Sequence, residues 1–243
     1  MERTKVYFAT DVHLGLNLKD PASREDRFVS FLRSIRKEDT KALYLLGDIW
    51  DFWYEYRDVV PKEAARVVSE LIQLLSEGIE VNFFEGNHDM WTFSFFESLG
   101  MKKLQQPLYV KIGDRTFCLG HGDALGGADF SYRLMFKVFH SKVARFLFSQ
   151  LHPWCAFRFG LGWSNSNRRK HTPYHFKGEQ EPLYKFAAGA PEQPDFFVFG
   201  HFHDSVDMQL PSGARFIVLK DWMDGGRPYA EFDTASSVFE LHS

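Results

Sequence analysis

The sequence predicts an α/β fold in which two β-sheets pack face to face and helices lie outside them. Two observations support this prediction. In the first part of the chain, β-prone apolar runs alternate with amphipathic helical patterns, which is typical of a layered α/β body. After Pro194 the chain is rich in strand-like runs. Its 243 residues, 44% of them hydrophobic, are enough for one domain, residues 1–243.

The first part of the chain is expected to alternate strands with helices. Strands are predicted over Val6–Thr10, Ala42–Leu46 and Glu80–Phe84. Between the first two strands, a helix is expected over about Arg24–Arg36, with Ser23 as its N-cap. The next helix opens at Pro61, a residue suited to a first helical turn, and ends at Gly78.

The second part is expected to consist mostly of strands. The run Leu108–Leu119 contains two strands around a Gly113-Asp114 turn, which is a hairpin signal. Four further strands are predicted over Phe196–Phe199, Arg215–Leu219, Tyr229–Phe232 and Val238–Leu241. Together with the earlier strands, these are enough to form the two sheets.

Residues 124–178 interrupt this pattern and are predicted to form an inserted helical cap. Eight apolar residues recur there at the spacing of one helix: Tyr132, Met135, Phe136, Phe139, Val143, Phe146, Leu147 and Leu151. Pro153 is expected to stop that helix, and a second aromatic group follows it. The apolar stripe has two interpretations. Either the stripe only packs the cap onto the body, or the cap lines a cleft for an apolar ligand. The expected lining residues are Phe136, Phe139, Phe146, Phe148, Trp154 and Phe157.

The charges are distributed unevenly along the chain. Nine of the 29 Lys and Arg residues fall within residues 130–177, which contain no Asp or Glu, whereas all 32 acidic residues lie outside that segment. A basic segment beside an acidic body indicates an anionic substrate or surface. The acidic body would repel a long polyanion, so we expect no nucleic-acid partner.

The composition also predicts the compartment. No apolar window is long enough to span a bilayer, and we expect no secretory signal before the first strand. The two cysteines, Cys118 and Cys155, form neither a CxxC pair nor a disulfide framework. A protein of the reducing cytoplasm is therefore expected.

Five polar motifs stand after strand-like runs. They are Asp11-Val-His13, Gly47-Asp48-Ile-Trp-Asp51, Gly86-Asn87-His88-Asp89, Gly120-His121-Gly-Asp123 and Gly200-His201-Phe-His203. In α/β proteins, functional sites lie at the edge of the sheet where the strands end. Asp, His and Asn without thiolate ligands suit divalent manganese, iron or zinc. Each motif alone is also compatible with an ordinary turn, but their joint order predicts a metal site.

The ligand candidates outnumber the needs of one ion, so we predict a two-metal centre. Its expected ligands are Asp11, His13, Asp48, Asn87, His121, His201 and His203. Asp11 and His13 are two residues apart on an extended segment, so their side chains point to the same side and can bind one ion. His203 can bind the same ion. Asp48 can bridge both ions. Two such ions position a bridging hydroxide for attack on a phosphate ester.

Four neighbouring residues are expected to assist. His88 points away from the metals if Asn87 points toward them, and can then stabilise charge on the phosphoryl group or protonate the leaving oxygen. Asp51 could hold the His88 ring in the required tautomer. Asp89 and Asp123 either orient a ligand histidine from the second coordination sphere or cap a loop.

The motifs DVH, GDIWD, GNHD, GHGD and GHFH resemble, in order, the signature of the calcineurin-like metallophosphoesterases over about Val6–Leu219. This resemblance implies an αββα sandwich of two mixed sheets and a two-metal hydrolase with the ligands named above. It supports the pairing of His88 with Asp51. Manganese, iron and zinc all suit this ligand set, and the narrower family described next implies manganese.

Within that superfamily, DVHLG, GDIWDFW and the aromatic-basic insertion are most similar to the UDP-2,3-diacylglucosamine pyrophosphohydrolases of lipid A synthesis. The resemblance implies cleavage of the pyrophosphate of this lipid-linked sugar nucleotide, releasing UMP and 2,3-diacylglucosamine 1-phosphate. It also implies peripheral contact with the anionic inner membrane. The expected substrate contacts in the cap are Asn165, Arg168, Lys170 and Arg133.

Two other functions stay open at this point. The best-known members of that group carry arginine where this chain has His88, so a different nucleotide or phosphodiester is an alternative substrate. A metal-binding scaffold without catalysis is a third interpretation, although the complete ligand set and His88 speak against it. The sequence leaves the oligomeric state undecided.

Overall fold

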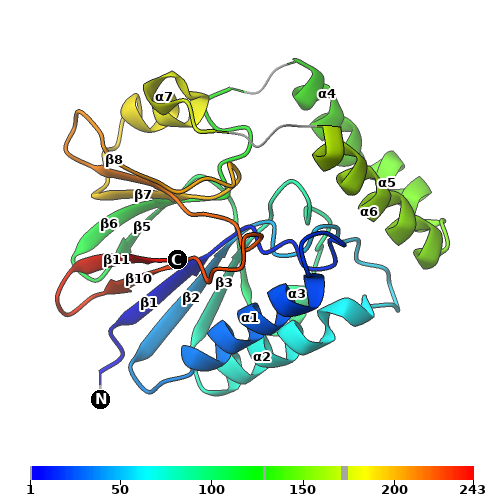
Figure 1. Ribbon diagram of the computed structural model, residues 1–243, viewed down its shortest axis with the longest axis horizontal. Helices are drawn as coiled ribbons and strands as arrows, with labels where there is room; N and C mark the ends of the chain where they lie inside the picture. The colour runs from blue at the N-terminus through cyan, green and yellow to red at the C-terminus, as the bar shows by residue number, and fades with distance from the viewer. Residues whose placement is uncertain (1, 128–129, 171–174) are drawn as a thin grey trace.

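The computed structural model describes residues 2–127, 130–170 and 175–243, and within them all side chains except those of residues 130–133 and 166–170. Its body contains two mixed sheets packed face to face (Figure 1). The first sheet has the strand order β11 (Val238–His242), β10 (Tyr229–Asp233), β1 (Lys5–Ala9), β2 (Thr40–Leu46), β3 (Glu80–Phe84), β4 (Lys102–Leu104). The second has the order β5 (Leu108–Ile112), β6 (Arg115–Leu119), β7 (Phe196–Phe199), β9 (Arg215–Val218), β8 (Val206–Gln209). The predicted two-sheet α/β fold is confirmed.

The central strands run parallel, which brings their carboxyl ends to one edge of the body. β1, β2 and β3 are parallel neighbours in the first sheet, and β6, β7 and β9 are parallel neighbours in the second. Both faces of β1 are buried, because Val6 and Phe8 enter the core between the sheets whereas Tyr7 and Ala9 enter the core under the helices. Burial on both faces explains why these strands are continuous apolar runs.

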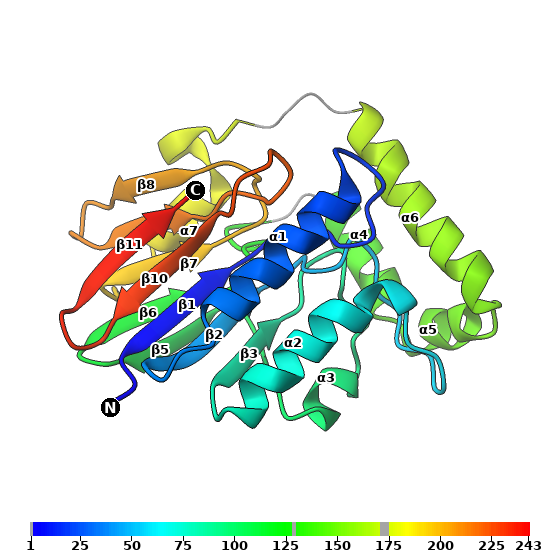
Figure 2. The same cartoon turned by 60° about the horizontal axis from the view of Figure 1, so that its bottom comes forward.

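Helices cover the outer face of each sheet (Figures 1 and 2). The first sheet is covered by α1 (Pro21–Ser34), η1 (Lys62–Ala64), α2 (Ala65–Ser76) and α3 (Phe95–Ser98). On the second sheet lies α7 (Pro182–Ala188), preceded by η2 (Gly178–Gln180). The first helix begins earlier than predicted, because the N-cap is Asp20, whose side chain accepts the Ser23 N–H.

Three further helices, α4 (Phe130–Phe139), α5 (Lys142–Ser149) and α6 (Pro153–Lys170), lie beside the body (Figure 2). The expectation of one helix reaching Leu151 is wrong. Ser141 has an extended backbone and caps α5 by accepting the Ala144 N–H, so the chain turns there. Pro153 does not stop the preceding helix, because α5 already ends at Ser149; instead it opens α6.

The three helices contact the body through aromatic side chains. Phe139 of α4 and Phe148 of α5 pack against Tyr54, Met90 and Trp91, which lie in the loops after β2 and β3. The Trp91 Nε1–H donates to the Phe139 carbonyl at 3.0 Å. These helices therefore lie next to the loops that carry the predicted ligands.

Candidate metal centre

The seven predicted ligands come from loops at the carboxyl ends of five strands. Asp11 and His13 follow β1, Asp48 follows β2 and Asn87 follows β3. In the second sheet, His121 follows β6, while His201 and His203 follow β7. The two sheets therefore both contribute to one cluster of side chains at this edge.

Five of these ligand positions have a left-handed backbone that non-glycine residues rarely adopt. Asp11, His13, Asp48, His201 and His203 have φ between 50° and 73°. Each such residue costs on the order of 1–2 kcal/mol. The fold holds them there through bonds between loops, such as His13 N–H to the Asp48 carbonyl at 3.0 Å. Strain concentrated at one group of polar residues is typical of a functional site.

Two motif glycines allow the loops to approach one another closely. A Cβ atom at Gly86 would clash with the Asp48 carboxylate, and one at Gly200 would clash with Thr10 and the Asp11 carboxylate. Only glycine leaves room for these carboxylates. The glycines that begin the GNHD and GHFH motifs are thus explained by contact between loops.

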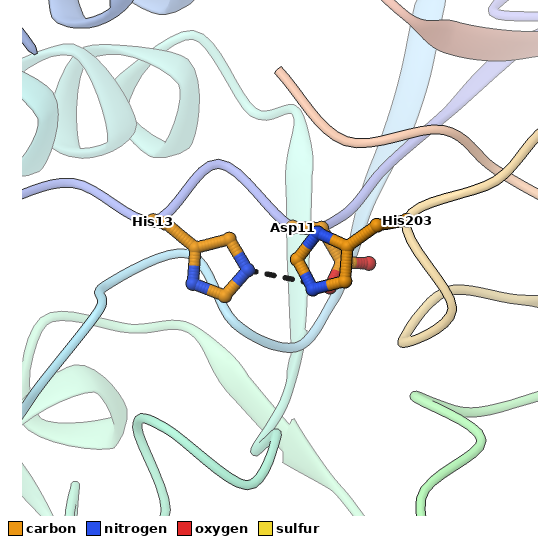
Figure 3. A group of neighbouring side chains, drawn as sticks. All are labelled: Asp11, His13 and His203. Carbon is orange, nitrogen blue, oxygen red and sulfur yellow. Dashed lines mark ion pairs between the residues drawn. The ribbon is translucent and has the colours of Figure 1, made fainter. Parts of the chain in front are cut away.

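Asp11, His13 and His203 form the first group of the cluster (Figure 3). The Asp11 Oδ1 atom lies 3.5 Å from His13 Nε2 and 3.7 Å from His203 Nε2. It is buried and has no hydrogen-bond partner among the described residues. Two ligand atoms about 2.1 Å from one ion lie roughly 3.0–3.4 Å apart, so these separations fit a shared cation.

Asp48, Asn87, His121 and His201 form the second group. His121 Nε2 lies 3.3 Å from Asp48 Oδ2 and 3.3 Å from Asn87 Oδ1, and the His121 and His201 rings are 5.1 Å apart. The same Asp48 Oδ2 atom is 3.9 Å from His13 Nε2 in the first group. Asp48 therefore lies between the two groups, where a bridging carboxylate is expected.

Three histidines are oriented in the same way. The Nδ1 atom of His13 faces Asp51 Oδ1 at 3.2 Å, and the Nδ1 atom of His121 faces the Leu46 carbonyl at 2.9 Å. In His203, Nδ1 lies 2.7 Å from Asp221 Oδ2. An acceptor at Nδ1 places the ring proton there and leaves the Nε2 lone pair for a metal, the arrangement common to metal-ligating histidines. The donor set fits two divalent ions.

The electrostatics of the cluster favour bound positive charge. Burial opposes ionisation of Asp11 and Asp48, but the surrounding histidines outweigh it and hold the pKa of both carboxyls below the ordinary range. Burial lowers the pKa of His121, yet Asp48 and Asp11 raise it well above the ordinary value. Burial, followed by the charge of His121, lowers the pKa of His201 to about 4. A cation can replace a proton held at His121.

Asp89 holds the two loops that carry Asp48 and Asn87. Its carboxylate accepts the N–H groups of Asp48, Ile49, Trp50 and Gly86 at 2.8–3.3 Å. Burial and then the charge of Asp48 raise its pKa to about 7. Of the two roles expected for Asp89, the structure shows the loop cap.

Asp123 has a similar scaffolding contact. Its Oδ1 atom and its carbonyl both accept from Gln106 Nε2, and Gln106 Oε1 in turn accepts the Gly122 N–H. Through these bonds, Asp123 and Gln106 together hold the loop on which His121 lies. Contact of Asp123 with a ligand histidine stays a prediction.

His88 and Asp51 are neighbours, but their contact differs from the predicted one. His88 Nδ1 lies 3.0 Å from the main-chain carbonyl of Asp51 and 3.6 Å from its Oδ1 atom. That Oδ1 atom is nearer to His13 Nδ1, at 3.2 Å. The His88 ring is thus held by a carbonyl, while the carboxylate of Asp51 mainly faces His13. Sequence spacing could not separate these two contacts.

A pocket of about 310 Å³ adjoins the centre at Asn87 and His88. Its apolar wall is Phe52, Met90, Trp91, Met135, Val138, Phe139, Ala144, Phe148, Phe159 and Trp163. The predicted lining residues Phe139 and Phe148 are among them, whereas Phe136, Phe146 and Trp154 are exposed elsewhere on the helices. The predicted catalytic histidine therefore forms part of the wall of an apolar pocket.

The structure describes only some of the polar side chains that are expected to contact the substrate from the cap. Ser164 lines the pocket, and its buried hydroxyl has no hydrogen-bond partner in the described parts of the chain. The predicted contact Asn165 is half-buried, with its Oδ1 atom also unpartnered there. The side chains of the other predicted contacts, Arg133, Arg168 and Lys170, lie outside the described residues. Sequence reasoning missed Ser164 and Asp221, because neither belongs to a ligand motif.

The resemblance inferred from the motifs is confirmed by comparison with known proteins. A model of the family described as calcineurin-like phosphoesterase matches residues 4–205. Over 258 residues the chain is 35% identical to the UDP-2,3-diacylglucosamine hydrolase of Porphyromonas gingivalis, covering 98% of this chain and 97% of that protein. It is 26% identical over 225 residues to the hydrolase of the same name from Shewanella piezotolerans, covering 91% and 92%.

A solved structure supports the fold independently. A dimetal phosphatase from Danio rerio aligns with a TM-score of 0.53 and 17% identity, covering 96% of this chain and 93% of that one. At this identity the likeness concerns the arrangement of sheets and helices. It agrees with two mixed sheets whose loops meet at one edge.

Proposed function

The chain belongs to the calcineurin-like phosphoesterases, and from this membership we propose that it hydrolyses the pyrophosphate of UDP-2,3-diacylglucosamine. The products would be UMP and 2,3-diacylglucosamine 1-phosphate. The relatives that bear the name of this activity align along nearly the whole chain, cap included. A water-soluble nucleotide or another phosphodiester is the alternative substrate.

The residues of the centre can be given distinct roles in this reaction. Asp11, His13, Asp48 and His203 would hold one ion, and Asp48, Asn87, His121 and His201 the other; we propose Mn²⁺ for both. Two bound divalent ions supply an activated water and neutralise charge on the phosphoryl oxygens. His88 faces the adjoining pocket with its Nδ1 atom held by the Asp51 carbonyl. It can therefore stabilise the phosphoryl group or give a proton to the leaving oxygen.

The observation that carries the proposal is the apolar pocket beside His88. An acyl chain is stabilised by transfer out of water into such a cavity, whereas the ribose and phosphates of a soluble nucleotide gain little from it. The cavity is lined by both the body and the cap, and it opens on the residues that would act on phosphate. The scissile group and an apolar chain of one substrate can therefore be held side by side.

The proposal is tested by incubating manganese-loaded protein with UDP-2,3-diacylglucosamine in mild detergent and measuring UMP. Rapid release that a chelator stops is the expected result. If no UMP is released but bis(p-nitrophenyl) phosphate is cleaved rapidly, the chain is a phosphoesterase and this substrate is rejected. Absence of both activities with both metals bound would favour a non-catalytic scaffold.

Filling the pocket should separate lipid hydrolysis from the phosphoesterase reaction. Ala144→Trp places an indole in the cavity, so we expect kcat/KM for the lipid substrate to fall by about tenfold or more, which corresponds to about 1.4 kcal/mol or more of lost apolar contact. Activity on bis(p-nitrophenyl) phosphate should be retained. Ile72→Trp is the control, because Ile72 is 41% exposed on α2 and does not line the pocket. Equal losses on both substrates would show that the change disturbs the centre instead.

We also propose that the cap meets the anionic cytoplasmic face of the inner membrane, where this substrate would lie. Phe146, Leu147 and Trp154 are more than 60% exposed on α5 and α6. Exposed Lys142 and Arg158 accompany them, and the Arg158 guanidinium lies 4.8 Å from the centre of the Trp154 ring. Apolar side chains with flanking cations suit a bilayer interface. None of the described helices is long and apolar enough to cross a bilayer.

Acidic substitutions on this surface should reduce membrane binding. For the double variant Phe146→Glu/Leu147→Glu, we expect partitioning onto vesicles with 30% phosphatidylglycerol to fall by about tenfold or more, since two apolar contacts are lost and two charges repel the lipid. Ile72→Glu is the control, because Ile72 is 41% exposed on α2, which covers the first sheet. Unchanged sedimentation of the double variant with vesicles would reject this surface.

A further inference from the structure

The loop between β9 and β10 contacts two of the segments that carry ligands. Its Asp221 is buried, and Asp221 Oδ2 lies 2.7 Å from His203 Nδ1 while Oδ1 accepts the Met223 N–H at 2.9 Å. The next residue, Trp222, donates its N–H to the Asp11 carbonyl at 3.2 Å. His203 and Asp11 belong to the same group of the centre (Figure 3).

The contact with Asp221 determines which nitrogen of His203 is available. An ionised carboxylate only accepts hydrogen bonds, so the ring proton lies on Nδ1. The Nε2 lone pair then points toward Asp11 Oδ1, 3.7 Å away. We propose that Asp221 is a positioning residue that sets the tautomer and direction of His203 for the ion it shares with Asp11 and His13. This inference rests on the two-metal centre of the proposed function, but not on the identity of the substrate.

The loop has other anchors, so this carboxylate is not needed to hold it. Besides the Trp222 bond to Asp11, the Arg27 Nη2 group donates to the Trp222 carbonyl at 2.9 Å. An amide at position 221 could still accept the Met223 N–H through its oxygen. Its NH₂ group would then face His203 Nδ1, and the proton would move to Nε2, the atom needed for the metal. Asp221→Asn therefore reverses the tautomer with little change of shape.

The test is a calorimetric titration of metal-free protein with Mn²⁺. For Asp221→Asn we expect the affinity of one of the two ions to fall by about 10–100-fold, the usual effect of removing a carboxylate behind a ligand histidine. Asp224→Asn is the matched control, because Asp224 is an exposed carboxylate on the same loop that pairs with Lys19 and Lys220. It should bind both ions as the unmodified protein does.

A second measurement separates positioning from a structural role. In ¹⁵N-detected spectra of the metal-free protein, His203 should carry its proton on Nδ1, and in Asp221→Asn on Nε2. Wild-type affinity for both ions, or an unchanged tautomer, would overturn the inference. So would loss of both ions together with a lowered midpoint of thermal unfolding. Neither measurement uses a phosphate ester. If the protein released no UMP from the lipid substrate, the proposed substrate would be rejected, but the role of Asp221 would not be affected.

Discussion

Asp48→Asn is expected to abolish binding of one of the two ions and to lower kcat/KM by more than about 10³-fold, since the charge that holds both ions is lost. Asp48 Oδ2 lies near His121 at 3.3 Å and His13 at 3.9 Å, one histidine from each group. A neutral amide keeps the shape, and its oxygen can still accept the His88 N–H that Asp48 Oδ1 accepts at 2.9 Å. The loss can therefore be assigned to the bridging position, because an NH₂ group in place of Oδ2 has neither the charge nor a lone pair for the ions.

The measurement for Asp48→Asn combines metal content after gel filtration with initial rates on bis(p-nitrophenyl) phosphate. Asp58→Asn is the control, because it removes an exposed carboxylate from the same connection between β2 and α2. The control should retain two ions and full turnover. Two tightly bound ions and normal turnover in Asp48→Asn would remove this residue from the centre.

His88→Ala is expected to lower kcat by about 10²–10⁴-fold while both ions bind normally, because general acid and charge-stabilising groups contribute that much. The His88 ring is held at Nδ1 by the Asp51 carbonyl and lines the apolar pocket. Its backbone N–H, which donates to Asp48, survives the substitution. Metal binding and turnover should therefore separate in this variant. His242→Ala, a change in the distant strand β11, is the control.

His88→Arg distinguishes the two roles open to His88. A guanidinium keeps positive charge beside the phosphoryl group but does not release a proton. Recovery to within about tenfold of the unmodified rate would assign charge stabilisation, whereas a rate as low as that of His88→Ala would assign proton donation. Loss of metal from His88→Ala would instead make His88 a ligand.

The sequence predicted the parts of this protein that depend on local patterns. Strands such as Phe196–Phe199 are buried apolar runs and the Gly113 turn closes a tight hairpin, so both are visible without a structure. The ligands of the metal centre could be predicted from the sequence for a related reason. Each ligand lies in the loop that follows a strand, and parallel strands necessarily bring such loops to one edge.

What the sequence missed depends on contacts between distant segments. Asp221 lies 18 residues after His203, with a strand on either side of its loop, and nothing local marks it as a partner. Asp51 is expected from the sequence to hold the His88 ring, whereas its carboxylate is nearer to His13. The helical stripe of the cap continues in sequence across Ser141, whereas in the structure Ser141 is extended and caps a new helix by accepting the Ala144 N–H. Hydrophobic periodicity contains no information about such a bond.

The division of labour between the strand loops and the cap has an evolutionary consequence. All seven candidate ligands belong to loops of the double sheet, and none belongs to residues 124–178. Selection for a new lipophilic substrate can therefore act on the cap alone, by substitution, lengthening or exchange, while the hydrolytic chemistry is inherited intact. Conversely, drift in the cap exposes a lineage to loss of its substrate before loss of catalysis. Homologous chains should consequently diverge faster between α4 and α6 than along the ligand loops.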